Sequence, residues 1–167
     1  MRTLFALVSV AAMASGGLTA CSPEPADDVV VGDCLQRGGP ADRPEATKAS
    51  CGTPESNFKV VAVISGSADG ADQCPADIDS FYSMRNIFSN SRTTLCLDID
   101  WVVGGCMSID PENGRDPIRA DCPDTNLPGR QRVTQILQNV ASGDQCASGV
   151  GYAYEERNFT VCVEHVA

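Results

Sequence analysis

Carboxylates are the side chains of this chain that are best placed to do chemistry. The sequence holds 22 acidic residues. Asp98 and Asp100 lie two apart on a predicted strand, so their side chains face the same side, and two carboxylates that flank a sugar hydrolyse a glycosidic bond. Other close pairs lie at predicted turns: Glu155 with Glu156, and Asp69 with Asp72. Because such pairs are expected by chance at this acid content, the interpretation we favour is a solvated acidic face.

Histidine and metal chemistry find little support. His165 is the one histidine of the chain, and its alternation with Val163 places it on the surface of a final strand. Serine and cysteine triads use a histidine base, so we expect no catalytic residue and no enzyme. The sequence has no Cys-x-x-Cys pair and no EF-hand loop. We therefore predict no metal site, no redox motif and no cofactor.

The N-terminus has the pattern of an export signal. Arg2 precedes an apolar stretch at residues 4–13, and Leu-Thr-Ala-Cys follows at residues 18–21. This is typical of a secretory signal, and the apolar stretch is too short to cross a bilayer as a helix. Residues 18–21 resemble the bacterial lipobox. The resemblance implies cleavage before Cys21 and attachment of acyl chains such as palmitate to the new N-terminal cysteine. The alternative is an ordinary signal with a chance cysteine.

The charge of the chain limits its partners. The net charge is −10 at pH 7, and so acidic a surface is repelled by nucleic acid and by anionic headgroups. We expect no nucleic-acid partner, and attachment to the membrane through the acyl chains on Cys21, because two or more chains anchor a protein stably. The predicted location is the extracytoplasmic face of the cell membrane. Residues 1–20 are then a lipoprotein signal peptide, and residues 21–28 a lipidated tether.

The other eight cysteines predict a disulfide framework. An even number in an exported protein is typical of one. Only 5% of the residues are aromatic, so the core has few large side chains and needs covalent support. Each bridge is expected to contribute about 3 kcal/mol. The eight are Cys34, Cys51, Cys74, Cys96, Cys106, Cys122, Cys146 and Cys162.

An internal duplication organises these cysteines. Val-Val-Gly-Asp-Cys-Leu at residues 30–35 matches Val-Val-Gly-Gly-Cys-Met at residues 102–107, and successive cysteines lie 17, 23 and 22 residues apart in the first copy and 16, 24 and 16 in the second. The sequence therefore predicts two four-cysteine modules, at residues 29–99 and 100–167. Many pairings are open, but equivalent bonds between sequence neighbours are favoured. These are Cys34–Cys51, Cys74–Cys96, Cys106–Cys122 and Cys146–Cys162.

Most segments predict strands. Residues 59–64 are rich in β-branched side chains. Residues 133–140 fit helical spacing when taken alone, but the duplication predicts a strand. Residues 152–154 and 159–163 alternate around a turn and predict a hairpin, whereas residues 77–82 are expected to form one or two helical turns capped by Asp77. The predicted fold class is mainly β, with a minor α+β component: two tandem homologous, disulfide-stapled modules of short antiparallel strands.

The aromatic side chains are expected in the core and not on a ligand platform, because the chain has few of them. The aromatic residues considered for such a platform are Trp101, Phe81, Tyr82, Tyr152 and Tyr154.

Several short motifs carry a family resemblance. Val-Gly-Asp-Cys-Leu at residues 31–35, Ser-Cys at 50–51 with Lys-Val-Val at 59–61, Gln-Cys at 73–74 and Leu-Cys-Leu at 95–97 resemble small actinomycete lipoproteins of the LppU type. The first motifs are also similar to the septum-formation domain of actinobacteria. In that domain Pro-His commonly follows the second cysteine, whereas this chain has Gly-Thr-Pro-Glu at 52–55. The resemblance implies an envelope lipoprotein and carries over no catalytic residue.

These observations lead to one expected function and two alternatives. We expect a non-catalytic binding or adaptor role at the outer face of the cytoplasmic membrane, toward an envelope protein or a wall component. One alternative is a carboxylate-dependent enzyme that acts on cell-wall glycans. The other is an inhibitor of a secreted hydrolase, because rigid disulfide frames present binding loops well. For such an inhibitor, the equivalent loops at residues 36–49 and 109–121 are the first to test by substitution.

Overall fold

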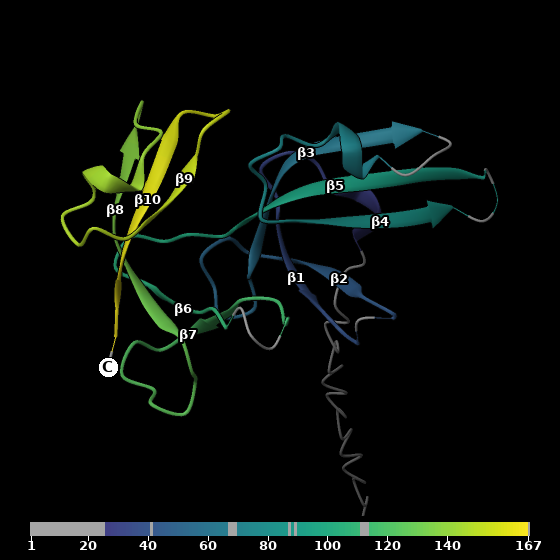
Figure 1. The fold of residues 1–167 in the computed structure, drawn as a ribbon. Coiled ribbons are helices and arrows are strands. Elements are labelled where there is room, and N and C mark those ends of the chain that lie inside the picture. The colour runs from purple at the N-terminus through teal and green to yellow at the C-terminus, as the bar shows by residue number, and fades with distance from the viewer. Residues whose placement is uncertain are drawn as a thin grey trace, which may run out of the picture.

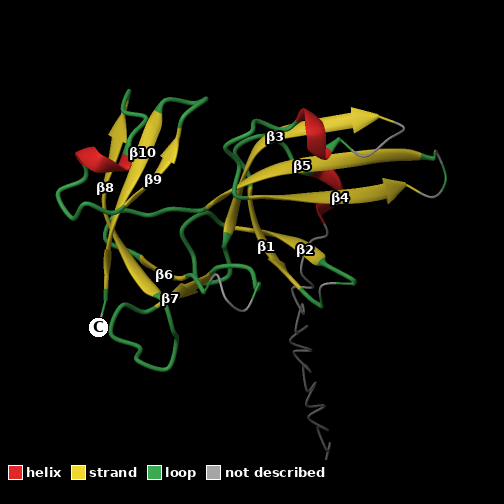
Figure 2. Cartoon of the chain, in the orientation of Figure 1, coloured by secondary structure: helices red, strands yellow, loops and turns green. Residues whose placement is uncertain are grey.

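The computed structural model describes residues 26–40, 42–66, 70–86, 88, 90–110 and 114–166. The predicted signal peptide, Cys21 with its lipidation, and Asp69 lie outside these ranges. No helix among the described residues is long and apolar enough to cross a membrane. Short 3-10 helices accompany a fold made of strands (Figure 2). The chain is therefore mainly β, as the sequence predicted.

The first five strands form one antiparallel sheet. They are β1 (Cys34–Gly38), β2 (Glu45–Ala49), β3 (Phe58–Gly66), β4 (Ser80–Asn86) and β5 (Ser91–Ile99). Their spatial order is β2-β1-β3-β5-β4. The 3-10 helix η1 (Ala26–Asp28) precedes β1, and η2 (Ala71–Gln73) lies between β3 and β4.

The next five strands form a second antiparallel sheet. They are β6 (Cys106–Ser108), β7 (Ile118–Ala120), β8 (Arg130–Gln138), β9 (Gly151–Tyr154) and β10 (Phe159–His165), with η3 (Gly143–Gln145) before β9. Their order, β7-β6-β8-β10-β9, repeats the order of the first sheet. Figure 1 shows the two sheets side by side, joined by the chain that follows β5. The fold class of two disulfide-stapled modules is confirmed.

The register of the central strands is repeated as well. Lys59 of β3 lies opposite Asp98 of β5, and Arg132 of β8 lies opposite Glu164 of β10. In both sheets the register of this strand pair shifts by one residue close to that point. Equivalent residues of the two sheets can therefore be compared one by one.

The four disulfides occupy equivalent places. One in each sheet closes a loop of 17 or 16 residues that spans the first hairpin, and the other ties the end of η2 or η3 to the strand β5 or β10. The pairs are Cys34–Cys51, Cys74–Cys96, Cys106–Cys122 and Cys146–Cys162. This is the pairing that the sequence favoured.

One local prediction is wrong. Residues 77–82 form no helical turns, because the chain from Ser80 onward is strand β4 and pairs with β5 along its whole length. The cross-strand bonds outweigh the spacing of three apolar side chains, as tertiary context often does. The strand predicted at residues 59–64 lies within β3, the strand predicted at residues 133–140 corresponds to β8 as far as Gln138, and the predicted hairpin is β9–β10.

Each sheet has an apolar core. The first is built on Leu35, Phe58, Val60, Leu95 and Leu97, and the second on Val133, Tyr154, Val161 and Val163. Trp101, Tyr82 and Tyr152 are partly buried and pack against these clusters. Phe81 is 45% exposed, so its prediction as a core residue is wrong.

Candidate functional site

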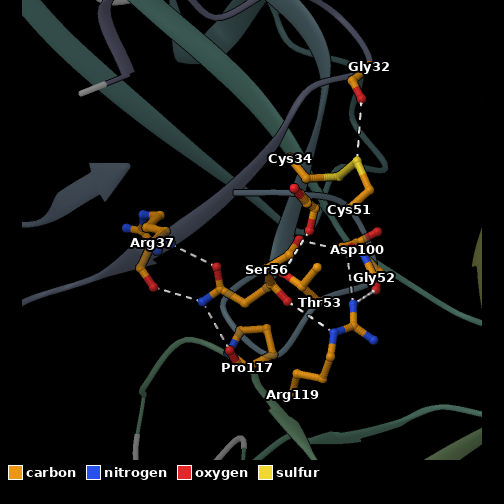
Figure 3. A network of polar contacts seen from close by, with 12 residues as sticks. Gly32, Cys34, Arg37, Cys51, Gly52, Thr53, Ser56, Asp100, Pro117 and Arg119 are labelled. Carbon is orange, nitrogen blue, oxygen red and sulfur yellow. Dashed lines mark hydrogen bonds and ion pairs between the residues drawn. A yellow bond between two sulfur atoms is a disulfide. The ribbon is translucent and has the colours of Figure 1, made fainter. Parts of the chain in front are cut away.

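Asp100 is a buried carboxylate that joins the two sheets. It follows β5 directly and is 5% exposed. Its Oδ2 accepts hydrogen bonds from Ser56 Oγ and the Gly52 amide, each at 2.6 Å, and from Arg119 Nη2 at 2.9 Å (Figure 3). Arg119 belongs to β7 of the second sheet, and its Nε also donates to the Ser56 carbonyl at 3.2 Å. These donors compensate the buried charge.

Asp98 makes a second buried ion pair between the sheets. It is 6% exposed and accepts from Arg157 Nη1, while Arg157 Nε donates to Asp77 Oδ1 at 3.0 Å. Burial raises the pKa of Asp98 to about 6, against the opposing effect of Arg157. The other carboxylate oxygen of Asp98, Oδ1, makes no hydrogen bond within the described residues.

A tyrosine completes this set of polar contacts. Tyr154 donates its hydroxyl proton to Asp79 Oδ2 at 2.6 Å and accepts from Trp101 Nε1 at 2.8 Å. Burial, followed by the neighbouring Asp79, raises the pKa of the Tyr154 phenol far above its ordinary value. The phenol therefore remains a donor at neutral pH.

The prediction of a solvated acidic face is wrong for Asp98 and Asp100. Both are buried and bound by arginines that lie 59 and 19 residues further along the chain. Glu155 and Glu156 are exposed in the turn between β9 and β10, and Asp72 is exposed too, as expected.

Sequence reasoning missed both arginines. The duplication offered one signal, because Arg119 occupies the position equivalent to Lys48. Arg119 lies opposite Met107 in the second sheet, as Lys48 lies opposite Leu35 in the first. Arginine at a duplicated lysine position indicates recognition by a planar fork of donors.

The two equivalent loops that the inhibitor alternative singled out come together at a cleft. It has a volume of about 620 Å³ and is lined by residues of both equivalent hairpins. Among them are Arg37, Gly39 and Pro44 from the first loop, and Asp116, Pro117 and Ile118 from the second. Gly39 has φ of 85°, and a Cβ there would lie 2.8 Å from the Arg43 carbonyl oxygen, so the turn requires glycine.

Asn57 holds the two sides of this cleft together. Its Nδ2 donates to the carbonyls of Arg37, at 2.7 Å, and Pro117, at 3.1 Å, and its Oδ1 accepts from the Arg37 amide at 2.8 Å (Figure 3). The Arg37 side chain forms an ion pair with Asp116 across the cleft. The loops are thus fixed relative to each other before any ligand arrives.

The histidine and the potential metal ligands lie at separate places in the structure. His165 is exposed at the end of β10, as predicted. Among the described residues, the grouping of potential metal ligands is Cys34, Cys51 and Asp100, whose ligand atoms lie within 4.8 Å of one another. The two sulfurs are bonded to each other, so neither offers the thiolate that binds metal. Asp100 is already held by three donors.

Comparisons with protein-family models, with curated proteins and with solved structures found no match to this chain.

Proposed function

We propose that this chain is a non-catalytic lipoprotein of the cell envelope that binds a partner at the outer face of the cytoplasmic membrane. The observation that carries the proposal is the cleft of about 620 Å³ between the two equivalent hairpins. That volume lies in the range of ligand-binding clefts, roughly 300–1,000 Å³. The expected partner is an envelope protein or wall component with a segment small enough to enter it.

The rigidity of the cleft supports a binding role. The Cys34–Cys51 and Cys106–Cys122 bonds span the two hairpins, and Asn57 joins one hairpin to the other. Preorganised loops bind with a smaller loss of conformational entropy. Acyl chains on Cys21 and the tether at residues 21–28 would keep the cleft close to the membrane.

The alternative functions receive less support from the site. A glycan hydrolase needs two carboxylates that are free to flank a sugar, whereas Asp98 and Asp100 are each paired with an arginine of the second sheet. Asp98→Asn and Asp100→Asn variants that fold but change the wall phenotype would favour the enzyme. An inhibitor would be expected to present a protruding loop, whereas these loops line a hollow.

A photocrosslinking experiment in intact cells tests the proposal. p-Benzoylphenylalanine replaces Ile118 in the cleft, or Phe81 on β4 as a control, because the two residues are 48% and 45% exposed. We expect one reproducible adduct from the Ile118 position, lost in an Asn57→Ala background that releases the loops, and none from Phe81. Adducts of equal yield at both positions, or at neither, would contradict a binding role for the cleft.

A further inference from the structure

A second cleft, here called the inter-sheet cleft, lies between the two sheets. It has a volume of about 600 Å³, within the usual range of ligand sites. It shares no lining residue with the cleft between the hairpins. Its lining is mostly apolar and includes Val31, Val61, Trp101, Ile136, Phe159 and Val161.

The walls of the inter-sheet cleft are the facing sides of the two sheets. In the second sheet, Phe159 and Val161 of β10 lie two apart, and Val161 lies opposite Ile136 of β8, so the three side chains share one face. In the first sheet, Lys59 of β3 lies opposite Asp98 of β5 and shares its face. That face is directed at the second sheet, because the arginine between β9 and β10 binds Asp98.

The apolar character of both walls is not common to the two copies. Val61 stands at the register shift of β3, where the equivalent residue of β8 is Thr134. Phe159 lies three residues before the disulfide cysteine of β10, where the equivalent residue of β5 is Thr93. On each wall a large apolar side chain therefore stands where the other copy has threonine.

Lys59 is the charge that remains available in this cleft. The charged residues of the lining are Lys59, Asp98, Asp100 and Arg157. Both carboxylates are buried, and each is paired with an arginine. Lys59 is exposed and has no ion-pair partner among the described residues, whereas the equivalent Arg132 pairs with a glutamate of its own sheet. A single ammonium group thus borders an apolar hollow.

We propose that the inter-sheet cleft binds a single-chain aliphatic carboxylate, with its chain between the two apolar walls and its head at the Lys59 ammonium group. Aliphatic side chains outnumber rings in the lining, so a flexible hydrocarbon chain fits it best. An ammonium group has three rotatable donors and accepts a carboxylate without a fixed orientation.

The acidity of the whole chain does not decide this contact. The net charge is −10, but exposed charges farther away than about 8 Å are largely screened at physiological salt. Contact with Lys59 and burial of the hydrocarbon chain therefore determine the affinity. The inference goes beyond the proposed function, because it concerns a different cleft and a small ligand. The crosslinking result at Ile118 does not bear on it, so either proposal can fail alone.

Trp101 fluorescence tests the inference, because Trp101 lines the inter-sheet cleft and is the one tryptophan of the chain. The purified protein, with its disulfides intact, is titrated at neutral pH with hexanoate, octanoate, decanoate and decanamide. We expect a saturable change with decanoate and at least tenfold weaker binding of decanamide. Affinity should rise with each added methylene group, by up to about fourfold.

Several outcomes of this titration would overturn the proposal. They are no saturable change with decanoate, equal affinity for decanoate and decanamide, and an affinity that does not depend on chain length. A fluorescence change on concentrating the protein alone would indicate a second copy of the chain in the cleft and would also overturn it.

Matched variants test the two parts of the site separately. Lys59→Gln is expected to weaken decanoate at least tenfold and to leave decanamide unchanged, whereas Arg132→Gln, at the equivalent exposed position, should change neither. Val61→Thr, which restores the residue of the other copy, should weaken both ligands. Unchanged decanoate affinity in folded Lys59→Gln or Val61→Thr protein would contradict the site. The titration of the unmodified protein remains decisive if a variant does not fold.

Discussion

In the second sheet Arg132 and Glu164 form an ion pair at 3.3 Å, with side chains 43% and 46% exposed. The equivalent pair in the first sheet is Lys59 and Asp98, and it is not formed. Asp98 is buried and bound by Arg157 of the other sheet, whereas Lys59 is exposed and has no ion-pair partner among the described residues. Duplication copied the strand order and the disulfides, but the partners of the charged side chains diverged.

The ends of the two central strands explain the difference. The end of β5 is covered by the second sheet, whereas β10 ends at the exposed His165. The amide of Asp100 bonds the Asn57 carbonyl as the amide of Val166 bonds the Arg130 carbonyl, so these positions are equivalent too. Asp100 is buried and needs a cation, which Arg119 provides. A buried carboxylate thus became the means of joining two copies of one fold.

The largest expected effect comes from removing that cation. Arg119→Ala leaves Asp100 buried without compensation, and we expect a loss of about 3–5 kcal/mol in the free energy of unfolding. Arg132→Ala, at the exposed pair, is expected to lose at most about 1 kcal/mol. Urea denaturation of the two variants makes the comparison. Equal losses would show that the two pairs do not differ as described.

Removing the disulfide of either first hairpin should lower the free energy of unfolding, by different amounts in the two sheets. A Cys34→Ala/Cys51→Ala variant is expected to lose about 3 kcal/mol through the unfolded state. The loss should exceed that of Cys106→Ala/Cys122→Ala, because the segment after Cys51 supplies the Gly52 and Ser56 donors to Asp100. Thermal and urea unfolding measure both. Peptide mapping without reductant should find no free thiol among the eight cysteines. Disulfides that join one sheet to the other would contradict the pairing of two bonds within each sheet.

The pH dependence of stability should depend on Asp98. Its pKa is raised from 3.8 to about 6 in the folded protein by burial, with smaller contributions from Asp79 and Asp77, and against the lowering effect of Arg157. The folded state therefore holds this proton more tightly, and the resulting stabilisation is complete below about 4 and lost as the pH rises through about 6. Relative to Asp98→Asn, the unmodified protein should gain stability as the pH falls from 7 to 4. A gap that stays constant across this range would contradict the raised pKa.

The smallest effect is expected at the exposed pair itself. A double-mutant cycle on Arg132 and Glu164 should give a coupling free energy of about 0.2–1 kcal/mol, because solvent and salt screen exposed charges. The cycle on Arg157 and Asp98 should give more and should respond less to added salt. A larger coupling at the exposed pair would reverse the comparison.

The sequence alone determined the strand-rich fold, the duplication and the four disulfides. Cysteine spacing, repeated flanking residues and β-branched segments are local signals that can be recognised without knowledge of the fold. Of the predicted strand at residues 133–140, which has helical spacing, residues 133–138 therefore do belong to a strand. The same signals brought attention to the two loops that line the cleft.

Only the tertiary structure decided the partners of the charged side chains and the path of residues 80–86. Strand β4 exists because it pairs with β5, and Asp98, Asp100 and Arg37 are bound by residues that lie 59, 19 and 79 positions away. Ion pairs and hydrogen bonds depend on distances in space and on the loss of water around a charge. Neither quantity is contained in the spacing of residues along the chain.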